Sequence, residues 1–181
     1  MKTLQPCWSL LALLLVGALA GCSTSTKSAD VSSQIRSSLD QAGFKNVSAS
    51  QDRDKGVVTL AGHVPADRDK AQAESIARSI AGSQVVSNQI AVIPPGAENE
   101  AEKVNSDLDK GIKSNLDAAL IQDRLHDSVK YAVKNHVVTL TGEVDSQSKR
   151  TRAEQVASAV LNVNQVVNEL QVKEQKASSS N

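Results

Sequence analysis

Residues that could hold a metal are few and widely spaced in this chain. The three histidines, His63, His126 and His136, show no ligand spacing such as His-x-x-x-His. His63 falls on the polar side of a predicted strand, and His136 falls in a predicted turn. We therefore expect all three to be solvated surface histidines rather than metal ligands.

Acidic and hydroxyl side chains also lack a catalytic arrangement. In residues 52–55 and 67–70, aspartates alternate with arginine or lysine, so charge cancels locally and no calcium-loop spacing results. The serines include no Gly-x-Ser-x-Gly elbow, and no histidine is placed to serve one as a base. A phosphate-binding glycine loop is missing too. The sequence therefore predicts a protein that is not an enzyme and needs no cofactor or metal.

The N-terminal 22 residues have the pattern of an export signal. Lys2 precedes an uncharged apolar run at residues 8–20, which is short for a bilayer span of about 20 residues. The run ends in Leu19-Ala20-Gly21-Cys22, which resembles the lipobox of bacterial lipoproteins. The resemblance implies cleavage before Cys22 and a diacylglycerol thioether on its thiol. Ser23, where a retention aspartate would stand, implies the outer membrane. The alternative is an ordinary secretory signal followed by a chance cysteine.

Cysteine usage follows from this processing. Cys7 leaves with the signal peptide, predicted as residues 1–21, and Cys22 is acylated, so the mature chain has no disulfide and no thiolate metal site. Residues 22–28 then form a flexible Ser/Thr-rich tether. The six residues 23–28 after Cys22 reach only about 20 Å when extended, so the fold that follows is expected near the membrane surface.

Charge and composition argue against a nucleic-acid partner. The 181-residue chain has 20 Lys+Arg and 20 Asp+Glu, so it lacks the basic excess that binds phosphate backbones. Aromatic residues make up only 2%, so platforms for stacking bases or sugars are absent. With 40% apolar and 22% charged residues, the composition is that of a folded soluble chain.

Positive charge gathers at one place, formed by Lys149, Arg150 and Arg152 at the start of a predicted helix. The helix dipole disfavours cations there, but the free backbone N–H groups of a first turn suit a phosphate group. We therefore predict that these three residues meet anionic lipid headgroups. The alternative is an exposed charged turn without a ligand.

These residues must be positioned by a unit that the sequence encodes twice. Residues 57–64 (Val-Val-Thr-Leu-Ala-Gly-His-Val) recur as residues 137–144 (Val-Val-Thr-Leu-Thr-Gly-Glu-Val), an offset of 80. The offset continues without a gap through the next helix and strand, where Ala73, Glu74, Ala77, Val86, Asn88 and Val92 match Ala153, Glu154, Ala157, Val166, Asn168 and Val172.

The first half of each unit reads as a helix followed by a hairpin. Apolar residues at four-residue spacing predict the first helix of each unit. In the first unit they are Val31, Ile35 and Leu39, and in the second they are Val104, Leu108, Ile112, Leu116 and Leu120. The helix of the second unit is therefore expected to be longer at its front. Residues 54–56 and 134–136 have the composition of tight turns. Gly62 and Gly142 stand on the apolar face of the following strand, which predicts close approach of a helix.

The second half reads as a crossover helix and a last strand. These helices begin near Ala66 and Ser146, of which serine is the better N-cap. Gly82 and Asn162 are predicted to end them in the left-handed conformation. The last strands are predicted at residues 85–92 and 165–172.

The whole pattern resembles the BON domain (bacterial OsmY and nodulation). Its signature is Gly-Val-Val-Thr-Leu-x-Gly-x-Val, a helix with Ala-x-x-x-Ala, then Gly-x-x-x-Val-x-Asn-x-Ile, which residues 56–90 follow except at Ser83. The second copy has His136 and Asn162 where glycine is usual. The resemblance implies an α+β fold of two tandem α-β-β-α-β BON domains, each a small mixed three-stranded sheet packed on two helices.

The predicted boundaries are BON domain 1 at residues 29–93, a Pro-rich linker at 94–98, BON domain 2 at 99–173 and a disordered tail at 174–181. A unit of about 65 residues has a marginal core on its own. We therefore expect the two domains to pack together.

For function, the resemblance implies a non-enzymatic outer-membrane lipoprotein facing the periplasm. Its BON domains would associate with anionic phospholipid or other envelope components and support membrane integrity under osmotic or envelope stress. The alternative is a periplasmic adaptor or chaperone that binds proteins through its helix faces.

Overall fold

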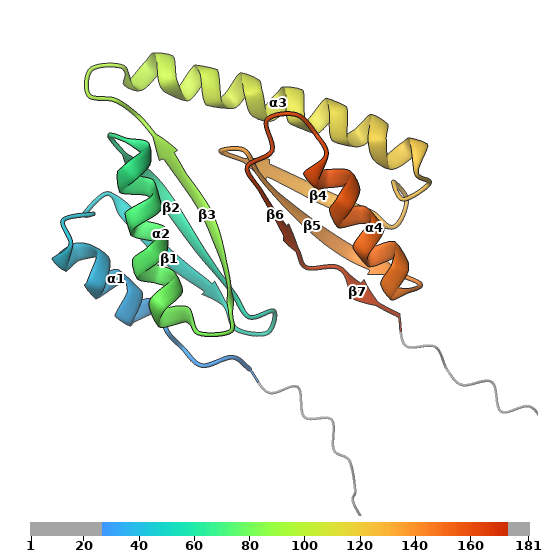
Figure 1. The fold of residues 1–181 in the computed structure, drawn as a ribbon, viewed down its shortest axis with the longest axis horizontal. Helices are drawn as coiled ribbons and strands as arrows, with labels where there is room; N and C mark the ends of the chain where they lie inside the picture. The colour runs from blue at the N-terminus through green and yellow to red at the C-terminus, as the bar shows by residue number, and fades with distance from the viewer. Residues whose placement is uncertain (1–26, 174–181) are drawn as a thin grey trace, which may run out of the picture.

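The fold contains the predicted order of helix, strand, strand, helix and strand twice (Figure 1). The structure, a computed structural model, describes residues 27–173; the predicted signal peptide, Cys22 and the predicted tail lie outside these residues. The elements are α1 (Ser32–Gln41), β1 (Val47–Asp52), β2 (Val57–Val64), α2 (Asp67–Ala81), β3 (Val85–Val92), α3 (Glu98–Gln122), β4 (Val129–Lys134), β5 (Val137–Val144), α4 (Gln147–Ser158), β6 (Gln165–Asn168) and β7 (Gln171–Val172).

Each unit has a small mixed sheet. In the first, β2 is central, with β1 antiparallel on one side and β3 parallel on the other. In the second, β5 is central between β4 and the parallel strands β6 and β7. Leu140 pairs with Asn168 and Glu143 with Gln171, which keeps one register. Strands β6 and β7 are therefore the predicted last strand, interrupted at residues 169–170.

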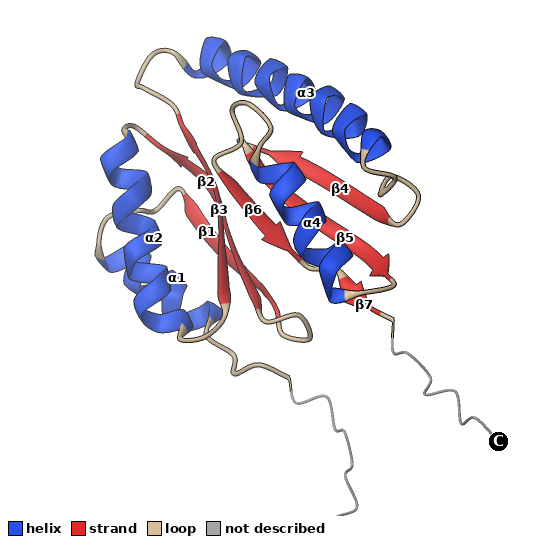
Figure 2. Cartoon of the chain, turned by 45° about the vertical axis from the view of Figure 1, so that its right-hand side comes forward, coloured by secondary structure: helices blue, strands red, loops and turns tan. Residues whose placement is uncertain are grey.

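The predicted apolar stripes build two separate cores, each between one sheet and its two helices (Figure 2). In the first unit, Ile35 and Leu39 of α1 and Ala73 and Ala77 of α2 are fully buried. The alanines bring α2 close to the sheet because they have almost no side chain to separate the two. The corresponding residues of the second unit are Leu116, Leu120, Ala153 and Ala157, and they are buried in the same way.

Helix α3 is longer at its front, as predicted, but its first turns have no core to enter. Ile112, Leu116 and Leu120 are buried, whereas Val104 is 56% exposed. The prediction that the apolar stripe begins at Val104 was therefore wrong. The periodic spacing continues into turns that run past the second core, along one end of both units (Figure 1).

The prediction of a helix beside Gly62 and Gly142 was also wrong. A Cβ on Gly62 would lie 1.9 Å from the carbonyl oxygen of Asn46, and one on Gly142 would lie 2.5 Å from that of Ser128. Both oxygens belong to the chain entering the neighbouring antiparallel strand. The φ angles of these glycines are +115° and +119°, values that residues with a side chain rarely adopt. These glycines leave room for the backbone that enters the edge strands β1 and β4, and the atoms nearest to their Cβ positions do not belong to a helix.

The second helices begin as predicted but end differently. Ser146 Oγ accepts a hydrogen bond from the backbone N–H of Lys149 (3.3 Å), whereas Ala66 offers no side-chain cap. Asn162 has a φ of +67°, but α4 already ends at Ser158 with Ala159 in the right-handed region, so the prediction that Asn162 ends this helix was wrong. Gly82 also has a positive φ, of 64°, but its ψ of −119° lies outside the left-handed helical region.

The two units pack together through the edges β3 and β6 (Figures 1 and 2). Val57, Val137 and Val167 form a small buried cluster between them. The side chain of Gln165 spans the junction: its Nε2 donates to Val86 O (2.7 Å) and its Oε1 accepts from Asn88 N–H (2.9 Å). The amide of Gln165 thus makes two hydrogen bonds to the backbone at the open edge of β3, as a neighbouring strand would.

Candidate functional site

The predicted headgroup residues lie on the first turns of α4, and each has a partner within the protein. Lys149 forms an ion pair with Asp145, and Arg152 forms one with Asp123 (2.7 Å). The guanidinium of Arg150 donates to two backbone carbonyls, Leu170 O (3.0 Å) and Asn168 O (3.1 Å). The three cations are therefore not a cluster of free charges. Arg150 fastens α4 to the interrupted strand beside it.

Lys149 nevertheless stands on the surface. Its side chain is 45% exposed and that of Asp145 is 62% exposed. The hydrogen bond from Lys149 lowers the pKa of Asp145 below its ordinary value, with a smaller contribution from the charge of Lys173. Lys149 and Lys173 thus both act on one carboxylate in this region.

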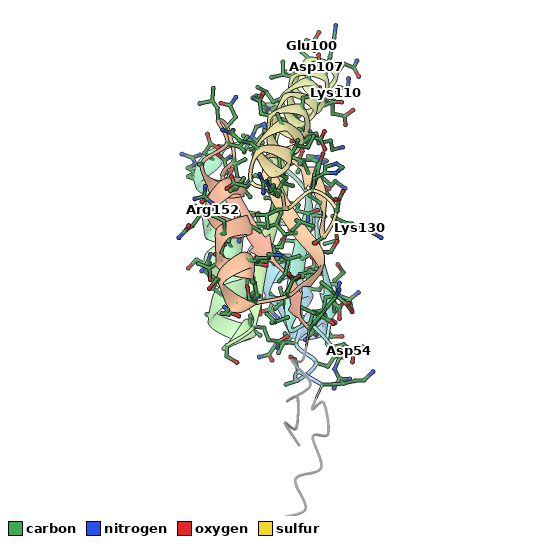
Figure 3. The ribbon with its side chains drawn as sticks, turned by 90° about the vertical axis from the view of Figure 1, so that its right-hand side faces the viewer. Asp54, Glu100, Asp107, Lys110, Lys130 and Arg152 are labelled. Carbon is green, nitrogen blue, oxygen red and sulfur yellow. The ribbon has the colours of Figure 1, made fainter. Side chains whose placement is uncertain are left out.

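These positions can be placed relative to the ends of the described chain. Lys27, the first turn of α4 and strand β7 lie in the same half of the molecule, which we call the tether end (Figure 1). Helix α3 runs along the opposite end, where Figure 3 shows Asp107 and Lys110, while Arg152 lies between the two ends. The first turn of α4 therefore lies nearer than α3 to the end from which the described chain starts (Figure 1).

The histidines divide into two kinds. His63 and His126 are at the surface: His63 contacts Asn46 Nδ2 (3.3 Å), and His126 Nε2 lies 3.1 Å from Asp117. His136 is different, because its Nε2 is buried and has no hydrogen-bond partner. The prediction of a solvated histidine was wrong there, since the domain junction covers a turn that looks exposed in the sequence. In residues 27–173, no group of three or more His, Cys, Asp or Glu could hold a metal.

One cavity, of about 470 Å³, brings together the residue types of a nucleophilic site. It lies under α3, and its lining includes Ser106, Asp109 and His63. The three are not connected as a relay. Both oxygens of Asp109 accept backbone N–H groups, from Asn135 (2.8 Å) and His136 (2.9 Å), and the contact of the His63 ring is with Asn46. The arrangement supports the β4–β5 turn rather than the activation of a hydroxyl.

Comparison with known families decides what these units are. The model of the BON domain matches residues 27–94 and again residues 107–174. The chain belongs to the BON-domain family. Residues 98–106, the first turns of α3, precede the second match. The long front of that helix is thus an addition to the second BON domain.

One relative has a sequence close enough to align over most of the chain. The osmotically-inducible protein Y of Escherichia coli (strain K12) is 32% identical over 146 residues, which cover 79% of this chain and 71% of that protein. In the described residues, no helix is both long and apolar enough to cross a membrane.

Solved structures give only a distant likeness. CdsD, a structural protein of the type III secretion system of Chlamydia trachomatis, is 15% identical, with a TM-score of 0.33 over 80% of this chain and 92% of that one. Its C-terminal domain is 14% identical, with a TM-score of 0.34 over 81% of this chain and 99% of that one.

Both BON domains contain the same polar contact between the crossover helix and the last strand. Asn88 Nδ2 donates to Glu74 Oε2 (2.8 Å), and Asn88 Oδ1 accepts from Ile90 N–H (3.3 Å). Asn168 repeats this contact with Glu154 (2.9 Å) and Leu170 N–H (3.2 Å). The signature asparagine thus joins the last strand to the crossover helix. The recurrence of a Glu and an Asn at one spacing in both copies is the signal that could have predicted it.

Proposed function

We propose that this protein is a non-enzymatic outer-membrane lipoprotein anchored at Cys22. On the periplasmic face, its BON domains associate with phospholipid and support membrane integrity under osmotic or envelope stress. Family membership supports the proposal, as does the relative named for osmotic induction. The lipobox-like segment before Cys22 supports the anchor.

The observation that carries the lipid contact is the position of Lys149 at the tether end. Lys27 is the fifth residue after Cys22, a reach of about 17 Å when extended. An anchored chain would therefore hold the first turn of α4 and Lys173 close to the bilayer. Both BON domains contribute to this end, so a short tether does not exclude the second one.

The energetics favour weak and exchangeable contact. An exposed ion pair such as Lys149–Asp145 contributes little to stability because water screens it, and a lysine beside an anionic surface gains about 1 kcal/mol. Lys149 can therefore exchange Asp145 for a lipid phosphate at little cost. Arg152 lies farther from the tether end, and Arg150 remains bound to its carbonyls and positions the turn. Such contact depends on ionic strength and becomes effective because the anchor raises the local lipid concentration.

The test is a titration with phosphatidylglycerol vesicles at low and high salt, using the Cys22→Ser protein so that the domains bind without the anchor. Backbone amide signals of the first turn of α4 and of Lys173 should change at low salt only, and phosphatidylcholine vesicles should have no effect. Lys149→Ala should abolish most of the change. Lys110→Ala is the matched control, because Lys110 is also an exposed helical lysine paired with an aspartate, at the opposite end (Figure 3).

Changes confined to other surfaces, or changes that survive Lys149→Ala, would refute the headgroup assignment. The adaptor alternative predicts instead that the protein suppresses aggregation of unfolded clients without binding vesicles. The large apolar side chains exposed within residues 27–173 are Val85, Val104, Ile121, Leu161 and Val172. Val104 and Ile121 stand near opposite ends of the 25-residue helix α3, and the other three lie on β3, after α4 and on β7. Single exposed apolar residues are ordinary in soluble proteins, so this pattern gives the alternative no docking surface.

A further inference from the structure

His136 combines two unfavourable features at one position. Its φ of +66° equals that of Gly56, the residue at the same place in the first BON domain. Glycine adopts this angle freely, whereas a side chain is strained there. In addition, its buried Nε2 has no partner. A strained and unsatisfied side chain where glycine would serve suggests that the imidazole has a role of its own.

The surroundings fix both the ring and its proton. The carboxylate of Asp109 accepts the backbone N–H groups of Asn135 and His136, which holds the turn in place. The amide Nδ2 of Asn164 lies 3.5 Å from His136 Nδ1. In this arrangement the amide NH₂ donates to Nδ1, which leaves Nε2 as the ring nitrogen that carries a proton. The unsatisfied atom is therefore a donor that requires an acceptor.

A small cavity of about 90 Å³ lies beside His136, between the two BON domains. A cavity needs only about 10–15 Å³ of such space to hold one water, so this one has room for a group of several heavy atoms. We call it the junction notch; its lining is Asp67, Lys70, Ile90, Ala91, Val92, Asn105, Asn135, His136 and Asn164.

The first BON domain contributes a second donor to the junction notch. Lys70 is half-buried, and burial lowers the pKa of its ammonium group, opposed by the charges of Asp67 and Glu74. Glu74 is itself paired with Arg78 (2.6 Å). No ion pair involves Lys70 in the part of the chain that the structure describes. The notch thus holds a desolvated cation together with a buried N–H donor.

We propose that the junction notch binds one small monoanionic oxyanion, a carboxylate or a singly charged phosphate, through the Lys70 ammonium and the Nε2–H of His136. Two donors from different domains suit the oxygens of one such group. The carboxylate of Asp67 in the lining disfavours a second negative charge. Binding joins groups from both BON domains and therefore stabilises their junction.

The position of the notch indicates a free anion rather than a lipid headgroup. Its lining includes Asn105 of α3, and α3 runs along the end opposite Lys27 (Figure 1). A bilayer at the tether end does not reach it. The inference is thus independent of the proposed lipid contact, and each can fail without the other.

The experiment is a titration of the Cys22→Ser protein with sodium acetate and, at pH 6, with sodium phosphate, at constant ionic strength set with sodium chloride. The signals of the His136 ring and the Asn164 side chain should shift saturably, and the melting temperature should rise. Phosphatidylglycerol vesicles should leave these signals unchanged. A shift with vesicles alone would overturn the free-anion assignment.

Two variants separate the site from a general salt effect. His136→Gly restores the residue found at Gly56, so it should fold well, and it should weaken binding at least tenfold; Lys70→Met should do the same. His126→Ala and Lys110→Met remove an exposed histidine and an exposed lysine elsewhere, and they should leave the affinity unchanged. No saturable shift in the parent protein, or equal affinity in His136→Gly, would overturn the proposal and leave the notch a water-filled space.

Discussion

At the scale of single residues, Glu74 shows how a polar contact holds a BON domain together. Burial alone would raise the pKa of its carboxyl group, but hydrogen bonds from Asn88 and Arg78 outweigh burial and lower that pKa below the ordinary value of 4.5. The folded state therefore stabilises the ionised form of the Glu74 carboxyl group. The contact between Glu74 and Asn88 joins α2 to β3. Protonation of Glu74 therefore affects the position of the helix on the sheet.

The sign of the pH dependence follows from this shift. A carboxyl whose pKa is lowered in the folded state stabilises the fold above its unfolded pKa, and this stabilisation is lost as pH falls through the folded value. We expect the free energy of unfolding to decrease below about pH 4.5. Glu74→Gln should make the decrease shallower, as measured by urea unfolding between pH 3 and 7. Glu143→Gln, on an exposed strand position, is the control; an equal effect of both variants would contradict the assignment.

The two strand glycines make a graded prediction. Alanine at either is strained by the positive φ and by contact with a strand carbonyl, and the contact is closer at Gly62 than at Gly142. Both variants should lose about 1–3 kcal/mol of stability, Gly62→Ala more than Gly142→Ala. Gly111 is helical with open space around its Cβ position, so Gly111→Ala should gain about 0.5–1 kcal/mol. Thermal and urea unfolding measure all three; a neutral Gly62→Ala would remove the explanation.

At the scale of elements, the spacing of apolar residues predicted the helices and the faces that they bury. The stripes from Ile35 to Leu39 and from Leu116 to Leu120 identified the helices and their buried faces, because burial repeats with the helical turn. The alternation of β2 placed Gly62 on the apolar face, whereas this position is exposed in the structure. The carbonyl beside it depends on the register between β1 and β2, which alternation within one strand does not reveal. Likewise, the spacing at Val104 continues beyond the end of the core, and no period in the sequence marks where a partner stops.

Candidate-site residues were harder to predict because their partners are distant in the chain. The three cations of α4 form a cluster in sequence, yet Arg152 is paired with Asp123 and Arg150 is bound to the carbonyls of Asn168 and Leu170. The burial of His136 depends on packing between two domains. Neither the partners of the cations nor that packing is visible from spacing within one helix or turn.

The junction of β3 with β6 gives a prediction at this scale. Gln165→Ala removes both hydrogen bonds to the open edge of β3, leaving Val86 O and Asn88 N–H without a protein partner. Each unsatisfied group costs about 1–3 kcal/mol if it stays buried, so the junction should open more often. Hydrogen exchange of the Asn88 amide should become at least tenfold faster. Gln155→Ala, at an exposed position of α4, should not change it. Unchanged exchange in Gln165→Ala would mean that the Gln165 side chain does not hold the edge of β3.

At the scale of the whole molecule, two small BON domains act as one body through a limited set of contacts. Besides the valine cluster and Gln165, Lys55 forms an ion pair with Glu169 (2.6 Å), whose side chain is only 10% exposed. The hydrogen bond to Glu169 raises the pKa of Lys55 above 10.5. This contribution is present at neutral pH and is lost only as pH rises through the raised value. The same body presents Lys149 and Lys173 at the tether end.

The proposed function depends on the lipid anchor at Cys22, and the mass of the N-terminal peptide tests this anchor most directly. Trypsin cleavage after Lys27 of protein recovered from outer-membrane fractions should release residues 22–27. We predict that this peptide begins at Cys22 and carries the added mass of a diacylglyceryl group and an acyl chain, and that the Cys22→Ser protein leaves the membrane fraction. A membrane-recovered peptide with a free Cys22 thiol, or a mature chain that begins at another residue, would contradict the account.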